Sequence, residues 1–164
     1  MNNLKAIFKY AWLATKHKYF VFKAGLKLKV PIRLLLLHDI SKFSLKELPH
    51  YGRQFFGDKS QPEKFSVAWL HHQNSNPHHW EYWIQRTGHD KSEGDSLILD
   101  MPEIYIREMI SDWMGASRAY DGKWPSPGNW PWMESENSSF RKVKVSIKTR
   151  ERIKEILNGL GFEI

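Results

Sequence analysis

The most constraining feature of the sequence is a set of titratable side chains at positions where helical periodicity calls for apolar residues. Each member lies three or four residues from apolar side chains of the same expected helix, and therefore on its apolar face. The set consists of His17, His38, Asp39, His72 and Asp112. Buried charges are costly unless they are paired or bind metal. Because the set is spread over four expected helices, we expect a helical fold that gathers it at one metal site.

Few segments show the alternation of a strand, and the chain reads as a series of helices and loops. The expected helices are 3–22, 31–43, 45–56, 62–72, 102–120 and 149–157, and the expected loops are 86–100 and 121–137. We expect Ala24–Gly25 to weaken the first helix, and Asp100 with Glu103 to form a capping box. The sequence thus predicts an all-α, single-domain bundle of about six helices.

The expected domain spans residues 1–164, with a core over about 12–118 and a closing segment at 121–164. Cysteine is absent, which excludes disulfides, zinc ribbons and thiol nucleophiles. Any metal ligands must therefore be His, Asp or Glu. No apolar run approaches the ~20 residues of a transmembrane helix, and lysines interrupt the apolar stretches near the N-terminus. We expect a cytoplasmic protein.

Charge is distributed unevenly along the chain. The net charge is +7, and residues 1–33 carry eight basic residues and no acidic one. This asymmetry has two interpretations, a solvated lysine-rich helix face or a polyanionic partner. The candidate partners are nucleic acid bound through residues 5–33, a nucleotide or other phosphorylated substrate, and an acidic membrane surface. The sequence does not define the oligomeric state.

Each candidate ligand also has a simpler explanation when taken alone. A single inward histidine is more often a hydrogen-bonded core residue. Asp112 could pair with Arg107 or Arg118, and the His78–His79 pair could start a helix or stack beside Trp80. Taken together, the recurrence of such residues on several helices favours a metal site. An exposed helix acid is the expected role of Glu108, with orientation of a ligand or membership of the metal shell as the alternatives. We expect His50, His71 and His89 to lie at the surface or behind the ligands.

The order of these residues resembles that of the HD superfamily of metal-dependent hydrolases. The matching elements are His17, the pair His38–Asp39, then His72, His78, His79 and Asp112. Residues 34–43, LLLLHDISKF, are similar to the helix that carries the HD pair in the HD-GYP branch of that superfamily. The segments HDISKF, NPHHWEYW and MPEIYIREMISDW also resemble an uncharacterised HD-like family of phages and bacteria. The resemblance implies an all-α fold and a metal centre.

The resemblance also implies roles for individual residues. It assigns His17, His38, Asp39 and Asp112 to a first ion, with Asp39 able to bridge to a second. His72 with one or both of His78 and His79 would hold that second ion. Lys42 matches a lysine that contacts substrate phosphate, so Asp39 and Lys42 are the expected catalytic residues. The further candidates for phosphate binding are Arg107 and Arg118. Imidazole and carboxylate ligands suit Fe, Mn, Zn or Ni.

Three functions fit this pattern. The first is a metal-dependent phosphohydrolase that acts on a nucleotide or another small phosphorylated compound through a dinuclear site. The second is a di-iron oxygenase on the same scaffold, because some HD-type proteins activate O₂ at a His/Asp di-iron centre. The third is a non-enzymatic module that binds nucleic acid or a nucleotide through the basic residues and exposed tryptophans.

Overall fold

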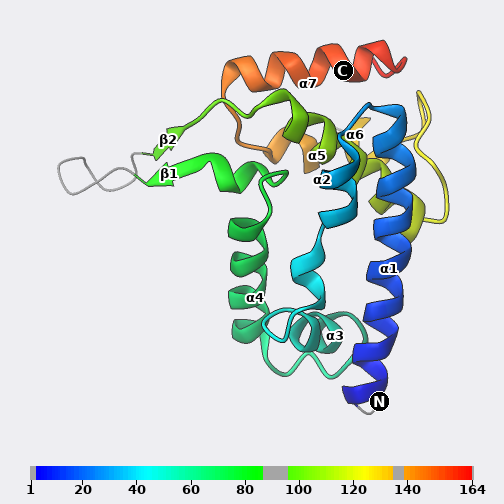
Figure 1. Ribbon diagram of the computed structural model, residues 1–164, viewed down its shortest axis with the longest axis vertical. Helices are drawn as coiled ribbons and strands as arrows, with labels where there is room; N and C mark the ends of the chain where they lie inside the picture. The colour runs from blue at the N-terminus through cyan, green and yellow to red at the C-terminus, as the bar shows by residue number, and fades with distance from the viewer. Residues whose placement is uncertain (1–2, 87–95, 135–138, 164) are drawn as a thin grey trace.

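Helix α1 (Asn3–Lys27) extends along one side of the computed structural model, which describes residues 3–86, 96–134 and 139–163 (Figure 1). One face of α1 is buried at small or apolar positions such as Ala6, Ala14 and Val21, with His17 among them. This face packs against α3 (Leu48–Phe56) and α5 (Glu103–Tyr120). The helical periodicity therefore places His17 inside the protein.

The first helix is longer than expected and continues through Ala24–Gly25, so the prediction of a weak point there is wrong. A Cβ atom built on Gly25 would lie 2.2 Å from Cδ2 of Leu35. Glycine is needed here because it lets the following helix, α2 (Ile32–Leu37), pack closely against α1. Gly25 would favour a helix break in an isolated segment, but in the folded protein it allows α1 and α2 to pack closely.

The expected helix 31–43 is two elements. Helix α2 ends at Leu37, and a 3₁₀-helix, η1 (Ile40–Phe43), follows. Asp39, between them, has a left-handed backbone conformation with φ 55°, and Asp is one of the few non-glycine residues that adopt it readily. In Figure 1 this segment descends between α1 and α4 (Pro62–Ser75), and it contacts both. The break turns the His38–Asp39 pair toward the space between these helices.

The remaining helices enclose two apolar clusters. The larger cluster joins α2, α5 and α7 (Ile147–Gly159), and includes the short helix α6 (Pro131–Glu134), which lies within the expected loop 121–137. The smaller cluster joins α1, α3 and α4. Two further 3₁₀-helices are η2 (Trp80–Trp83) and η3 (Ser139–Lys142). On α7 the buried residues include Ile153, Ile156 and Leu157.

Two local predictions are wrong. The ends of the expected loop 86–100 contribute to an antiparallel pair of strands, β1 (Ile84–Arg86) and β2 (Ser96–Ile98). Residues 87–95, including His89, lie outside the described residues. The expected capping box is absent, because Pro102 is the N-cap of α5 and makes no side-chain hydrogen bond. Asp100 instead accepts a hydrogen bond from the hydroxyl of Ser146 at 2.6 Å, which ties it to the start of α7.

The fold class is as predicted from the sequence. The described part of the chain contains seven α-helices and one two-stranded sheet, in a mostly all-α single domain. Among the described residues, no helix combines the length and the apolarity that a membrane span requires.

Candidate metal centre

The carboxylate of Asp39 lies at the middle of the buried histidines. Its Oδ2 atom is 3.4 Å from Nε2 of His17 and 3.5 Å from Nε2 of His38. Its Oδ1 atom is 3.3 Å from Nε2 of His72 and 3.4 Å from Nε2 of His78. The two oxygens of one carboxylate thus face two different groups of imidazoles.

The first group joins α1, the α2–η1 junction and α5. It consists of His17, His38, Asp39 and Asp112, whose donor atoms lie within 4.8 Å of one another. Oδ1 of Asp112 is 2.8 Å from Nε2 of His17 and 3.3 Å from Nε2 of His38. This donor set of two imidazoles and two carboxylates could hold a metal ion.

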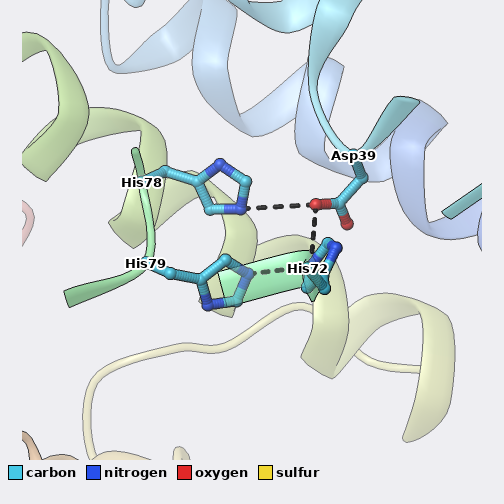
Figure 2. Close-up of side chains that lie close together, drawn as sticks. All are labelled: Asp39, His72, His78 and His79. Carbon is cyan, nitrogen blue, oxygen red and sulfur yellow. Dashed lines mark hydrogen bonds and ion pairs between the residues drawn. The ribbon is translucent and has the colours of Figure 1, made fainter. Parts of the chain in front are cut away.

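The second group joins the same Asp39 to α4 and the turn that follows it. It consists of Asp39, His72, His78 and His79, again with donor atoms within 4.8 Å. Figure 2 shows the rings of His78 and His79 extending toward Asp39 and His72, with Nε2 of His79 2.9 Å from Nε2 of His72. Both His78 and His79 belong to the group. Three imidazoles and a carboxylate could likewise hold an ion.

Several donor atoms at the centre are buried without a hydrogen bond in the described part of the chain. They are both ring nitrogens of His17, Nε2 of His38, Nε2 of His78 and Oδ1 of Asp39. Nε2 of His17 and Nε2 of His38 both lie within 3.5 Å of Asp39 and of Asp112, so these atoms converge on one shared space. Buried polar atoms are normally satisfied. A metal ion satisfies such a set at once.

Two buried glutamates orient the histidines from behind. Nδ1 of His38 donates to Oε1 of Glu108 at 3.0 Å, and Nδ1 of His78 is 3.4 Å from the same oxygen. Nδ1 of His72 donates to Glu47 at 3.0 Å. A carboxylate behind the ring fixes the tautomer, so that Nε2 presents its lone pair to the centre. This arrangement is typical of histidines that bind metal.

Neither glutamate was the first expectation for a residue of the centre. Glu108 is buried, so the expectation of an exposed helix acid is wrong and the alternative, an orienting residue, describes its contacts. Its position four residues before Asp112 was the available signal. Glu47 precedes α3 and is fully buried, and no sequence pattern singled it out. It also accepts a hydrogen bond from Nδ1 of His71 at 2.7 Å, which places that histidine behind the ligands.

The side chain of Lys42 lies inside the centre. Its ammonium group donates to Oδ2 of Asp39 at 2.5 Å, and the residue is buried. Burial disfavours the charged form of Asp39, but His38 and Lys42 outweigh it and hold the pKa of Asp39 well below its usual range. Burial also acts to lower the pKa of Lys42, and Asp39 outweighs this and raises it. The pair is therefore ionised.

Burial and neighbouring charges also set the protonation states of Asp112 and His79. Burial raises the pKa of Asp112, but His17 and His38 outweigh it and hold that pKa well below its usual value. Burial, followed by the neighbouring His78 and His72, lowers the pKa of His79 well below its usual value. The ring of His79 is therefore neutral and keeps a lone pair, as a metal ligand requires.

A cavity of about 450 Å³ opens onto Asp112, His78 and His79. Aromatic rings line much of its wall, namely Trp69, Trp80, Trp113, Tyr120 and Trp132. Glu81 and Asp121 also line it, and no lysine or arginine does so among the described residues. A second cavity of about 350 Å³ reaches His38, His78 and Glu108. Small molecules can thus approach the centre along an aromatic wall.

The structure does not bring the two arginine candidates to the centre. The guanidinium of Arg107 donates to Glu103 on its own helix and to the carbonyl of Leu28. The guanidinium of Arg118 donates to the carbonyl of Gly122 and lies over the ring of Phe20. In the described part of the chain neither arginine pairs with Asp112, which faces His17 and His38 instead, and Arg107 forms its ion pair with Glu103. His50 is half-buried and belongs to neither donor group.

Comparison with known proteins gives one family match. The model of a family of unknown function, DUF5662, matches residues 7–159, which include every donor residue described above. No curated protein and no solved structure matches the chain. Because the match covers most of the sequence, the chain belongs to the family DUF5662.

Proposed function

We propose that the protein is a metal-dependent phosphohydrolase that acts on a nucleotide or another small phosphorylated compound at a dinuclear His/Asp centre. The observation that carries the proposal is the shared carboxylate of Asp39. One oxygen faces His17 and His38, and the other faces His72 and His78. Two donor groups that share one carboxylate are the arrangement expected of two adjacent ions.

The donors fit such a pair of ions. Asp39 and Asp112 supply negative charge, and the five imidazoles supply nitrogen ligands of the kind preferred by Fe, Mn, Zn and Ni. The Nε2 atoms of His17, His38 and His78, which are buried without a hydrogen bond, each lie within 3.5 Å of an oxygen of Asp39 or Asp112. The order of the residues also resembles that of the HD superfamily, which supports the same assignment. In that assignment His17, His38, Asp39 and Asp112 hold one ion, and Asp39, His72, His78 and His79 hold the other.

When two divalent ions are bound, they lower the pKa of a water molecule and stabilise the charge of an in-line phosphoryl transfer. The protein's own contribution is orientation and charge. Glu108 and Glu47 fix the rings of His38 and His72 so that Nε2 faces the centre. The ammonium of Lys42 is held beside Asp39, where it can neutralise a phosphate oxygen. Aromatic side chains line the cavity that opens onto Asp112, His78 and His79.

Metal content and phosphate release together test the proposal. Purified untagged protein is analysed for metals and assayed with p-nitrophenyl phosphate and a panel of nucleotides. The wild type is compared with His38→Ala/Asp39→Ala and with the control His50→Ala, which changes a histidine outside both donor groups. We expect about two equivalents of metal and metal-dependent phosphate release in the wild type and the control. We expect both to be lost in the double variant.

Two results would contradict the proposal. Absence of metal from the wild type, even after reconstitution, would remove the basis of any metal chemistry here. Two equivalents of iron with O₂ consumption and no phosphate release would favour the di-iron oxygenase instead.

A further inference from the structure

The outer face of α1 carries a stripe of exposed apolar side chains. Phe8, Trp12, Tyr19 and Leu26 follow one another at intervals of four, seven and seven residues, which places them on the same side of the helix. Phe8 is 67% exposed and Trp12 is 68% exposed. We call these four residues the outer apolar stripe. Aromatic side chains this exposed are uncommon on a surface that faces only water.

A parallel stripe of lysines borders the outer apolar stripe. Lys5, Lys9, Lys16 and Lys23 each precede one of its residues by three positions, so every apolar side chain has a lysine beside it. All four are exposed, and none forms an ion pair with a carboxylate of the described residues. Residues 1–33 contain no acidic side chain. The face is therefore apolar on one side and strongly positive on the other.

The fold does not use this face. The buried face of α1, with His17, packs on α3 and α5 and lies on the other side of the helix. On the neighbouring helix α2, Leu36 and Leu37 are also exposed. The ammonium of Lys18 on α1 donates to the carbonyls of Leu36 and His38 at 2.7 and 2.9 Å. The outer apolar stripe of α1 thus lies outside the metal centre.

We propose that this face of α1 binds the surface of an anionic lipid bilayer. A helix that lies in the membrane interface has Trp, Phe and Leu on one face and lysines beside them, and the arrangement here matches that description. The aromatic rings would enter the boundary between headgroups and acyl chains, while the lysines contact the anionic headgroups. The inference is independent of the function proposed for the metal centre.

Charge and side-chain type favour lipid over the other candidates. A second copy docked through the same face would bring two lysine stripes together, and their repulsion would oppose the contact. A nucleic acid would engage the lysines and could stack on Trp12, but it offers nothing to Leu26, Leu36 and Leu37. A bilayer with anionic headgroups satisfies both the charged and the aliphatic residues.

Vesicle flotation tests the inference with the full-length protein. We expect the wild type to float with vesicles of phosphatidylcholine and phosphatidylglycerol, to remain unbound with phosphatidylcholine alone, and to dissociate as salt is raised. Lys9→Glu/Lys16→Glu should weaken binding by at least ~20-fold, since each lysine near an anionic surface contributes about fivefold in affinity. Phe8→Ser/Trp12→Ser should also release the protein.

The controls for these variants lie on α7. Lys154→Glu changes an exposed lysine and Ile147→Ser changes an exposed apolar residue, and both variants should bind as the wild type.

Brominated acyl chains give a direct readout of insertion. Bound wild-type protein should show quenched tryptophan fluorescence, and Trp12→Phe should bind normally but lose most of the quenching. Circular dichroism and metal content of each variant check that the fold is intact. Failure of the wild type to float with anionic vesicles would overturn the inference. So would a dimer that dissociates on Phe8→Ser/Trp12→Ser, or salt-dependent binding to single-stranded RNA in place of vesicles.

Discussion

Asp39 combines a special backbone conformation with a shared side chain. Helix α2 ends at Leu37, and the non-helical backbone of His38 followed by the positive φ of Asp39 directs the carboxylate between two sets of histidines. A continuous helix would carry the chain past them. The cost of the left-handed conformation is small for Asp compared with most residues. The backbone conformation of Asp39 thus places the carboxylate on which the proposed dinuclear centre depends.

The two orienting glutamates allow the two donor groups to be separated experimentally. Glu47 contacts His72 and His71, and only His72 is in a donor group, whereas Glu108 contacts a histidine of each group. We expect Glu108→Gln to weaken binding of both ions by about 10–100-fold, because an amide does not fix the rings as a carboxylate does. Glu47→Gln should weaken one ion and leave about one equivalent bound. Titration against a chelator measures this.

The matched control for these two variants is Glu151→Gln, an exposed helix acid that belongs to neither donor group. It should bind metal as the wild type does. Equal loss of both ions in Glu47→Gln would show that the donor groups are not independent.

Residues that sit on apolar helix faces could be predicted from sequence, and those that depend on neighbouring helices could not. His17, His72 and Asp112 stand out because their positions violate the periodicity of their own helices. Nothing in the local sequence indicates that Glu47 is enclosed, because the elements around it are distant along the chain. From the sequence, Lys42 is either an ordinary exposed lysine or a lysine that contacts substrate phosphate, and its burial beside Asp39 excludes the first interpretation.

The helices themselves follow the apolar pattern, while their ends follow tertiary contacts. The expected 102–120 helix matches α5 within one residue, because its apolar period is regular. The first helix exceeds its expected end because Gly25 packs against Leu35, and the second ends early at Leu37. Glycine and aspartate have several possible structural roles, and only the neighbouring element selects one.

The close approach of α1 and α5 gives a prediction at the level of the element. A Cβ atom on Gly115 would lie 2.6 Å from Cγ2 and 2.7 Å from the backbone nitrogen of Val21. Gly115→Ala should lower the free energy of unfolding by ~1–3 kcal/mol, because the backbone of α1 must move. It should also weaken metal binding, since the same helices carry His17 and Asp112. Urea denaturation and chelator titration measure the two effects.

Gly159 provides the control for this change. It is also helical, but nothing lies within 4 Å of a Cβ built on it. Gly159→Ala should leave stability unchanged or raise it by up to ~1 kcal/mol, because alanine favours the helix. A loss of stability as large as that of Gly115→Ala would mean that the close approach is not the cause.

Glu103 links α5 to α7 and makes their contact sensitive to pH. Hydrogen bonds from Arg152 and Arg107 lower the pKa of Glu103 to about 2. A depressed pKa in the folded state stabilises the protein above the unfolded value near 4.5, and this contribution is lost as pH falls toward 2. Because Glu103 is exposed, Glu103→Gln should cost less than ~1 kcal/mol at pH 7. Thermal unfolding at pH 7 and pH 3 should show a smaller difference between variant and wild type at the lower pH.

The centre also couples metal binding to the stability of the whole molecule. Its ligands come from α1, the α2–η1 junction, α4 with its following turn, and α5, so an ion bound there holds together segments far apart in sequence. The unfolded chain does not keep these groups together, and metal should therefore stabilise the folded state by linkage. At a free metal concentration 100 times the dissociation constant, the stabilisation amounts to about 2.7 kcal/mol per site.

The melting temperature of the wild type should rise as metal is added and fall with a chelator. His38→Ala/Asp39→Ala should show neither change, because it lacks ligands of the first group and the carboxylate shared by both. If the melting temperature of the wild type does not respond to metal, the buried cluster does not bind metal in the folded protein.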